Sequence, residues 1–351
     1  MSSASLSSEP LLDDATDDMS RDQARQAFAE QHLGAGVEPV ALPADASFRR
    51  YYRVVSDGGT SWLLMDAPPE HENLAAYLRV AGYLHTHGFS APAIKAQDLA
   101  QGFALIEDFG DQTYTRLLNA GAEEAPLYAL AIDALAALHQ KPLPNSDAGF
   151  DLYNKERLLT EASLFPDWYW AYIKGEGPTS AERSTFMGLV EAQLDAVANR
   201  QVCVVLRDYH VDNLMLRPDQ AAGSLESCGL LDFQDALIGA KAYDLMSLLE
   251  DARRDLSDDL VAAMIDRYCA ALPGTDRDVL MADYKILGMT RHAKILGIFV
   301  RLNERDGKPK YLKHLPRVAR LLARSLTAPS LVPMAQFLDD ACPGWRNPPQ
   351  V

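Results

Sequence analysis

The spacing of apolar residues along the chain changes near Gly110. Before this residue, short runs rich in β-branched, aromatic or apolar side chains predict five strands, and an Asp57-Gly58-Gly59 turn separates two of them. The predicted strands are residues 37–42, 48–55, 61–65, 92–98 and 103–107, and the predicted helices of this part are 21–33 and 73–87. After Gly110, helical spacing dominates, as over 113–120, 127–139 and 181–199. The pattern predicts an α+β chain with a small antiparallel β lobe followed by a larger, mainly helical lobe.

The chain has 351 residues, which corresponds to about two units of ~150 residues. We place the first lobe at 21–108, the second at 109–330 and a C-terminal extension at 331–351. Residues 1–20 carry five acidic side chains and no basic one, and a segment so poor in apolar surface is expected to be a disordered acidic tail. The start lacks the features of a secretory signal, and no apolar run is long enough to cross a bilayer.

The charge balance restricts the partners. With 33 basic and 49 acidic residues, the net charge is −16, which disfavours binding to nucleic acid or to an anionic membrane. The four cysteines, Cys203, Cys228, Cys269 and Cys342, are too widely spaced for a zinc motif. We therefore expect a cytoplasmic, monomeric protein with reduced thiols and a small-molecule partner.

Two loops hold the residues that indicate chemistry. Asp208 and Asn213 lie five positions apart directly after a buried apolar run at 202–206, and Asp232 ends a second run at 229–233. These two runs predict buried strands or a hairpin. An Asp and an Asn from neighbouring loops suit magnesium, which takes its other ligands from water and substrate phosphates. Each residue alone could instead be an ordinary turn residue.

Taken together, the order Asp-x4-Asn, apolar strand, Asp-Phe resembles the catalytic core of the protein kinase-like superfamily, and within it the aminoglycoside phosphotransferase family. Among its branches, the chain is most similar to the kinases that phosphorylate the anomeric hydroxyl of N-acetylmuramate and N-acetylglucosamine in cell-wall recycling. The stretches that carry this likeness are ASFRRYYRV, LLMDAPPE, LIEDFGD, LFPDWYW, LRDYHVDNLML and LLDFQDALIGAKAYDL. The resemblance implies a bilobal kinase-like fold with a nucleotide-binding N-lobe and a catalytic, substrate-binding C-lobe.

The resemblance also implies roles for the motif residues. Asp208 would orient or deprotonate the acceptor hydroxyl, while Asn213 and Asp232 would hold Mg²⁺ on the phosphates of ATP. Asp244 would accept hydrogen bonds from the backbone of the catalytic loop, although it could also simply cap the following helix.

The nucleotide-binding candidates come from two segments of the N-lobe. The loop at 44–50 occupies the place of a glycine-rich flap, and solvated arginines on a hairpin are the alternative to phosphate contact. The second segment would be the hinge beside adenine, or else an ordinary turn between lobes. The candidates are Ser47, Phe48, Arg49, Arg50, Glu107 and Phe109.

For the acceptor we name Trp168, His210, Gln234 and Asp235. A tryptophan face suits the C–H face of a sugar, but aromatic clusters are more often helix core. Trp168 and Trp170 point in different directions on a helix, so at most one would face a ligand. Gln234 and Asp235 could bond sugar hydroxyls or close their own loop, and His210 could contact substrate or brace the loop.

Two departures from the family pattern leave other functions open. One is Leu206, which stands where a histidine often precedes the Arg-Asp of the catalytic loop. The strand position expected to carry a phosphate-binding lysine reads Leu64-Met65-Asp66, so Arg49, Arg50 or Arg53 would have to supply the positive charge. The basic stretch 291–324 is assigned to the scaffold, with a lesser possibility that it lines an anionic-substrate cleft. An aminoglycoside kinase and a catalytically silent binding protein are the alternative functions.

Overall fold

The computed structural model describes residues 14–43 and 48–349. The chain divides into two compact units, Met1–Leu78 with Pro92–Gly110, and Arg79–Ala91 with Asp111–Val351. Residues 79–91, predicted to belong to the first lobe, and residues 331–349, predicted to form a separate extension, pack with the helical part. In that part, the backbone N–H of Leu230 donates to the carbonyl of Ser90, 2.7 Å away, and the hydroxyl of Tyr169 donates to the carbonyl of Trp345 at 2.6 Å.

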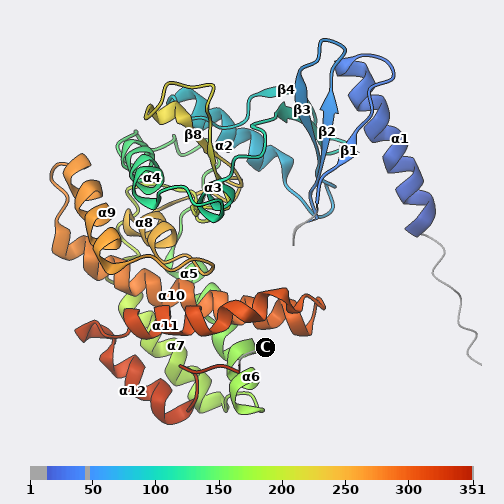
Figure 1. Ribbon diagram of the computed structural model, residues 1–351. Coiled ribbons are helices and arrows are strands. Elements are labelled where there is room, and N and C mark those ends of the chain that lie inside the picture. Colours follow the sequence, from blue (N-terminus) through green and yellow to red (C-terminus); the bar gives the residue numbers. More distant parts are fainter. Residues whose placement is uncertain (1–13, 44–47, 350–351) are drawn as a thin grey trace, which may run out of the picture. The chain divides into compact units, whose positions relative to one another are not determined.

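The first unit contains the predicted five strands. They form one antiparallel sheet with the order β1-β2-β3-β5-β4 (Figure 1). The strands are β1 (Val40–Ala41), β2 (Arg50–Val55), β3 (Ser61–Asp66), β4 (Ile94–Asp98) and β5 (Phe103–Glu107). Tight turns at Asp57–Gly59 and near Gly102 connect neighbours, and a Cβ at Gly102 would lie 2.0 Å from the carbonyl oxygen of Ala67. Only glycine fits at this position, because a side chain would clash with Ala67 and because the backbone φ of Gly102 is +73°.

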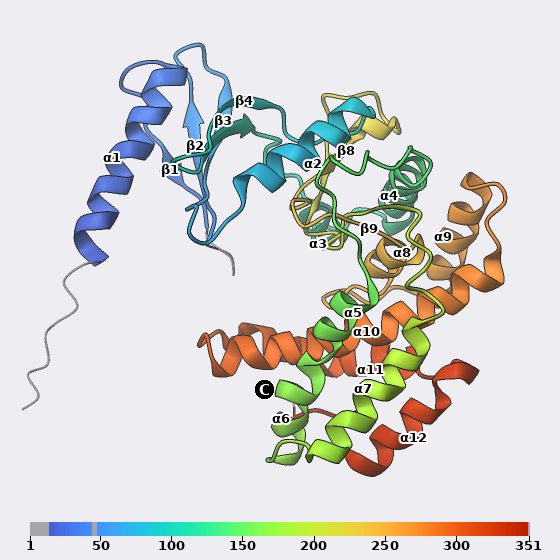
Figure 2. The same cartoon turned by 180° about the vertical axis from the view of Figure 1, so that it is seen from behind.

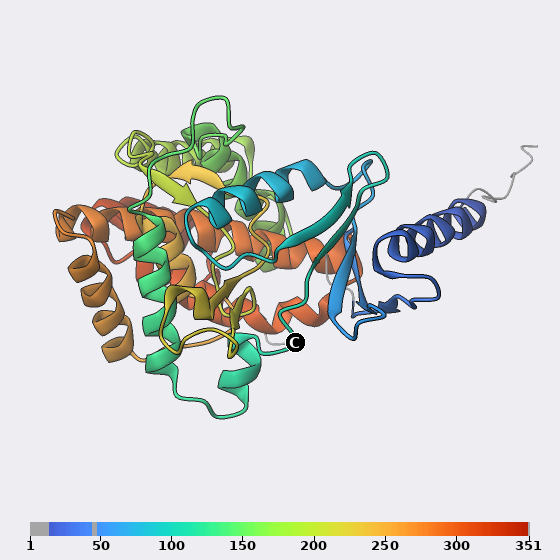
Figure 3. The ribbon, with the colours of Figure 1, turned by 90° about the horizontal axis from the view of Figure 1, so that it is seen from above.

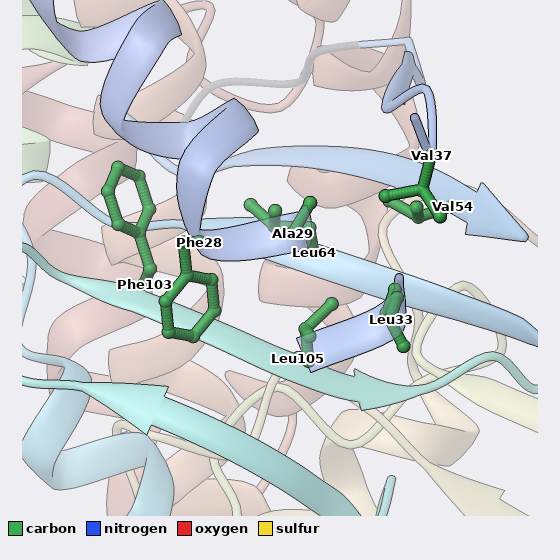
Figure 4. Close-up of a cluster of buried hydrophobic side chains, with 8 residues drawn as sticks. All are labelled: Phe28, Ala29, Leu33, Val37, Val54, Leu64, Phe103 and Leu105. Carbon is green, nitrogen blue, oxygen red and sulfur yellow. The ribbon is translucent and has the colours of Figure 1, made fainter. Parts of the chain in front are cut away.

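Helix α1 (Asp14–Leu33) covers one face of this sheet. It begins seven positions before the predicted start at Arg21, so the end of the expected acidic tail is helical; residues 1–13 lie outside the described part. Phe28, Ala29 and Leu33 of the helix pack against Val54, Leu64, Phe103 and Leu105 of the strands (Figure 4).

The buried end of β3 carries a charge, which α1 neutralises. The carboxylate of Asp66 is 5% exposed and accepts from the Arg21 Nε at 2.8 Å and the Arg25 Nη1 at 3.2 Å. Because an unpaired buried carboxylate is costly, these two arginines fix where α1 lies on the sheet.

The second unit is mainly helical, as predicted. Helix α2 (Leu74–Thr86) starts in the first unit and ends in the second. The remaining α-helices are α3 (Tyr114–Asn119), α4 (Glu124–Leu138), α5 (Lys155–Ala162), α6 (Trp170–Lys174), α7 (Ser180–Leu194), α8 (Ala242–Leu249), α9 (Asp258–Ala271), α10 (Arg277–Glu304), α11 (Leu315–Ser325) and α12 (Val332–Ala341). Among the described residues no helix combines the length and the apolar character that a membrane crossing requires.

Helix α10 is the central element of the second unit. Helices α5, α8 and α11 and the π-helical turn η1 (Phe165–Tyr169) pack along its 28 residues (Figure 2). At Gly297 the helix lies so close to the backbone of Leu164 that an added Cβ would be 2.1 Å from the Leu164 carbonyl oxygen. Helices α4 and α9 lie side by side at another edge of this unit (Figure 3).

Two short antiparallel ladders interrupt the helices. Strand β6 (Cys203–Val205) pairs with β9 (Leu237–Gly239), and β7 (Leu214–Leu216) pairs with β8 (Cys228–Leu230). The two apolar runs, which contain β6 and β8, were therefore correctly identified as buried strands. They do not form a hairpin with each other, because β6 pairs with β9 and β8 pairs with β7. All four cysteines are free, and Cys203, Cys228 and Cys342 are buried.

Candidate active site

The two ladders bring the motif loops together. Asn213 directly precedes β7 and Leu231 directly follows β8; since Leu214 pairs with Leu230, Asn213 lies opposite Leu231 and next to Asp232. The N–H of Leu231 donates to the Asn213 carbonyl at 2.9 Å. Strand β6 ends at Val205, two residues before Arg207, and Val205 pairs with Leu237 at the start of β9. The loop that carries Asp208 therefore begins at the end of the ladder where the loop that carries Asp232 enters β9. The antiparallel register thus explains why residues 19 and 24 positions apart in the chain converge.

The side chain of Asn213 lies between the two carboxylate-bearing residues. Its Nδ2 donates to the backbone carbonyl of Asp208 at 2.9 Å and lies 3.4 Å from the Oδ2 of Asp232. Because the amide nitrogen faces the protein, the amide oxygen is left to serve as a ligand. The structure thus places the side chain of Asn213 next to the backbone of Asp208 and the carboxylate of Asp232, and the catalytic and metal-binding roles of the three residues remain predictions.

Asp232 has an unusual backbone conformation, with a φ of +55°. A left-handed conformation is uncommon for a residue with a side chain and is often found at functional sites. The Nε2 of Gln234 donates to the Asp232 Oδ1 at 3.0 Å and to the Asp235 Oδ2 at 3.3 Å. Gln234 therefore braces the predicted metal ligand.

Asp208 lies beside a buried cation. Its side chain is 40% exposed, whereas that of Arg291 on α10 is 7% exposed, and the Arg291 Nη2 is 3.6 Å from the Asp208 Oδ1. Partial burial of the Asp208 side chain favours the neutral acid and would raise its pKa. The positive charges of Arg291 and Lys294 outweigh this effect and lower the pKa of Asp208 to about 2. The Asp208 side chain is therefore ionised at neutral pH and remains partly accessible.

The peptide before Asp208 is held from several sides. The carboxylate of Asp244 accepts from the N–H of Leu206 and, at 2.9 Å, from the N–H of Arg207. Asp244 lies inside α8 and does not cap it, which confirms the role implied by the family likeness. The guanidinium of Arg207 pairs with Glu161 of α5, whose carboxylate also binds the Lys294 Nζ at 2.8 Å.

The residues present suit a magnesium ion. Asn213 and Asp232 supply two oxygen ligands of the kind that Mg²⁺ prefers. Within residues 14–43 and 48–349, no three His, Cys, Asp or Glu side chains cluster closely enough to form a metal cage. Such a two-residue set fits an ion that takes its remaining ligands from phosphate oxygens and water.

The other acceptor candidates differ in their accessibility. His210 is 7% exposed, with its Nε2 3.5 Å from the Asn213 Nδ2, which places it under the loop as a brace. Trp170 is fully buried against Phe165 and Phe337, while Trp168 is half-buried on the π-helical turn. Asp235 is exposed beside Gln234. Trp168, Gln234 and Asp235 remain predictions as sugar contacts.

The nucleotide candidates belong to the first unit. Ser47 lies outside the described residues. Phe48 is exposed and stacks on His71, with ring centroids 4.3 Å apart. Arg49 pairs with Glu72 at 3.3 Å, and Arg50 is exposed at the start of β2.

In the hinge segment, the Oε2 of Glu107 accepts from the N–H of Ala93 at 3.2 Å, and Phe109 is half-buried. Between them lies Asp108, whose carboxylate accepts from the Arg53 Nε at 2.7 Å, the Arg53 Nη2 at 3.1 Å and the Ser61 hydroxyl at 2.6 Å. Arg53 thus forms an ion pair with Asp108. The predicted contacts of Arg49 and Arg50 with phosphate remain predictions.

Sequence reasoning did not identify Arg291, Lys294 and Glu161 as parts of the site. The first two lie in the basic stretch that was assigned to the scaffold, and the third has no motif around it. The only sequence signal is that Arg291 and Lys294 share one helix face at spacing i, i+3. That spacing does not reveal what the face contacts.

Comparisons with known proteins agree with this geometry. Residues 38–281 match the phosphotransferase enzyme family. A Caulobacter vibrioides protein named N-acetylmuramate/N-acetylglucosamine kinase is 35% identical over 358 residues, covering 92% of this chain and 97% of the relative. A Pseudomonas aeruginosa protein with the same name is 36% identical over 312 residues, covering 86% and 88%.

The fold has a solved counterpart. A putative aminoglycoside phosphotransferase from Ralstonia eutropha superposes with a TM-score of 0.60 at 14% identity, covering 87% of this chain and 97% of that structure. The predicted bilobal, kinase-like class is thereby confirmed. With the catalytic motif, the fold and the family match in agreement, the chain belongs to the phosphotransferase enzyme family.

Proposed function

We propose that this protein is an ATP- and Mg²⁺-dependent sugar kinase that transfers the γ-phosphoryl group to the anomeric hydroxyl of N-acetylmuramate, N-acetylglucosamine or both. The product would be the sugar 1-phosphate, formed in the cytoplasm during cell-wall recycling. The observation that carries the proposal is the convergence of Asp208, Asn213 and Asp232, in a chain whose relatives over most of its length are named as kinases of these two sugars.

In this proposal the acceptor oxygen attacks the γ-phosphorus while the bond to the β,γ-bridging oxygen breaks, and ADP leaves. The hydroxyl proton passes to the Asp208 carboxylate as the new P–O bond forms. A carboxylate with a pKa of about 2 is a weak base, so its main contribution is to hold the hydroxyl oxygen in line with the phosphorus. An anomeric hydroxyl suits a weak base because the ring oxygen makes it more acidic than an ordinary alcohol.

Asn213 and Asp232 would hold Mg²⁺, which neutralises charge on the phosphates. Gln234 keeps one oxygen of Asp232 oriented, and the Asn213 amide nitrogen fixes the loop that carries Asp208. These residues lie in loops beside the strands β7, β8 and β9, and their mutual hydrogen bonds orient the reacting groups.

The test is to incubate the protein with ATP, Mg²⁺ and N-acetylmuramate, N-acetylglucosamine or kanamycin, and to follow ADP release. The reducing-end assay identifies the position, since phosphate on the anomeric oxygen abolishes the reducing end and phosphate elsewhere preserves it. We expect ADP release with an amino sugar and an equal loss of reducing ends. The matched control is Asp208→Asn, which keeps the shape but should lose about 10²-fold or more in kcat.

Other outcomes would replace the proposal. ADP release with kanamycin alone would indicate an aminoglycoside kinase, which the net charge of −16 would favour through attraction of a cationic drug. No release with any acceptor would indicate a nucleotide-binding or partner-binding protein without catalysis.

A further inference from the structure

We infer that Arg291 is a positioning residue of the phosphotransfer reaction: it holds the Arg207–Asp208 segment in the left-handed turn that presents the Asp208 carboxylate. This inference rests on the role proposed above for Asp208. It assigns a function in catalysis to a helix residue far from every motif, and it does so through contacts to the backbone and to the side chain of the same loop.

The turn needs an external constraint. Among the described residues, Arg207 and Asp232 are the non-glycine residues with positive φ, and Arg207 has a φ of +70°. An arginine has no side-chain group that stabilises this conformation locally, unlike asparagine or aspartate. Left to itself, the peptide would relax to a right-handed or extended form, and the Asp208 side chain would then leave the site.

One guanidinium group contacts both the carbonyl group of Arg207 and the side chain of the next residue. The Arg291 Nη1 donates to the carbonyl oxygen of Arg207 at 3.0 Å, and its Nη2 lies 3.6 Å from the Asp208 Oδ1. The hydroxyl of Tyr243 accepts from the same Nη1 at 3.0 Å. Arg291 is 7% exposed and lies on the 28-residue helix α10, which packs against α5, α8 and α11.

The remaining groups of Arg207 are also bound, but none of them reaches Asp208. The Arg207 N–H donates to Asp244, its guanidinium pairs with Glu161, and the Ser247 hydroxyl lies 3.3 Å from its carbonyl oxygen. These contacts fix where the turn lies. Arg291 is the one that couples the turn to the direction of the catalytic carboxylate.

The geometry requires an arginine. The planar guanidinium presents several N–H donors in a fixed fork, so it can bind a carbonyl and face a carboxylate at the same time. A lysine at this position would keep the charge but could not span both groups from one rigid plane. The conservative change Arg291→Lys therefore separates positioning from charge.

The experiment compares Arg291→Lys, Arg291→Met and the control Arg267→Lys. Arg267 is also paired with a carboxylate, that of Asp133, but on the exposed side of α9, with its side chain 47% exposed. For each variant we would measure sugar phosphorylation, ATP hydrolysis without a sugar, KM for ATP, and amide hydrogen exchange of the 206–210 segment.

We expect Arg291→Lys to lower kcat for sugar phosphorylation by about tenfold or more, because displacement of an aligning group is costly. ATP hydrolysis to water and KM for ATP should stay within about twofold, since neither depends on aligning the sugar hydroxyl. Exchange in the 206–210 segment should become faster by about tenfold as the turn loosens. Arg267→Lys should change none of these.

A parallel loss of phosphorylation and hydrolysis would overturn the inference, because it would show a general structural role. Unchanged phosphorylation in Arg291→Lys would overturn it as well, whether or not Arg291→Met folds. If the wild-type protein phosphorylates no sugar, the proposed function fails, and the exchange measurement still decides whether Arg291 holds the turn: slow exchange retained in Arg291→Lys would refute that.

Discussion

The side-chain nitrogen of Asn213 donates to the backbone carbonyl of Asp208 at 2.9 Å, so the proposed metal ligand and the proposed acceptor-positioning residue form one unit. Asn213→Ala would remove both the amide oxygen and this hydrogen bond. We expect kcat to fall by about 10²-fold and the Mg²⁺ concentration for half-maximal rate to rise by about tenfold. The measurement is the initial rate across a Mg²⁺ titration at saturating ATP. Asn145→Ala, on an exposed loop, is the control, and a shift of equal size there would refute the assignment.

Because β3 has no lysine, we predict that arginines near the start of β2 neutralise the negative charge of the ATP phosphates. Met65 is buried and uncharged, and Asp66 is an anion bound by Arg21 and Arg25, so this end of β3 supplies no cation for the phosphates. We expect Arg49→Ala or Arg50→Ala to raise KM for ATP by about three- to tenfold, equivalent to one charge-assisted contact, with little change in KM for the sugar. Steady-state kinetics with ATP varied will measure this.

Arg157→Ala is the control for these variants, since that residue pairs with Asp151 in the second unit. If both Arg49→Ala and Arg50→Ala retain wild-type nucleotide kinetics, the compensation hypothesis is wrong.

His139 predicts an acid-dependent loss of stability. The ring is buried, its Nδ1 is 2.6 Å from the Tyr268 hydroxyl, and its Nε2 is buried without a hydrogen-bond partner. Burial and the positive charge of Lys241 lower its pKa from 6.5 to about 3. The folded state therefore stays unprotonated while the unfolded state binds a proton below pH 6.5, so the stabilising contribution is complete above pH 6.5 and is lost towards pH 3.

At pH 5 this linkage corresponds to about 2 kcal/mol of lost unfolding free energy. We expect His139→Gln to be less stable than wild type at pH 7.5 but to lose about 2 kcal/mol less between pH 7.5 and pH 5. Urea unfolding at both pH values provides the comparison. Tyr268→Phe removes the partner and keeps the imidazole, so it should retain the wild-type pH dependence; a flattened dependence in that variant would argue against His139 as the source.

Two glycine-to-alanine changes in helices should have opposite signs. At Gly297 of α10 the new Cβ would lie 2.1 Å from the Leu164 carbonyl oxygen, and backbone must move. We expect a loss of about 1–3 kcal/mol in unfolding free energy. At Gly188 of α7 the position is exposed and no atom lies within 4 Å of the new Cβ, so Gly188→Ala should add about 0.5–1 kcal/mol. Equal effects at both sites in denaturant titrations would contradict the close approach of α10 to the backbone at Leu164.

The strands, the main helices and the residues of the catalytic motif could be predicted from the sequence because each leaves a local signal. Alternating or continuous apolar runs set β2, β3 and β5. The Asp-x4-Asn spacing after a buried run places Asp208 and Asn213 in the loop between β6 and β7, which belong to two different ladders. The start of α1 was missed because acidic, small residues resemble a disordered tail until Arg21 and Arg25 are bound to Asp66.

Other features depend on contacts between distant parts of the chain. A basic residue on an amphipathic helix has the same local pattern whether it faces water or a carboxylate on a distant loop, so nothing near Arg291 indicates that it reaches Asp208, 83 positions earlier. Likewise, Arg53 has the same neighbours in sequence whether it contacts a nucleotide or, as the structure has it, Asp108. The chain's local chemistry determined which residues could react. Their surroundings, and therefore their charge and direction, were decided by how the helices pack, because electrostatic and hydrogen-bonding energies depend on proximity in space.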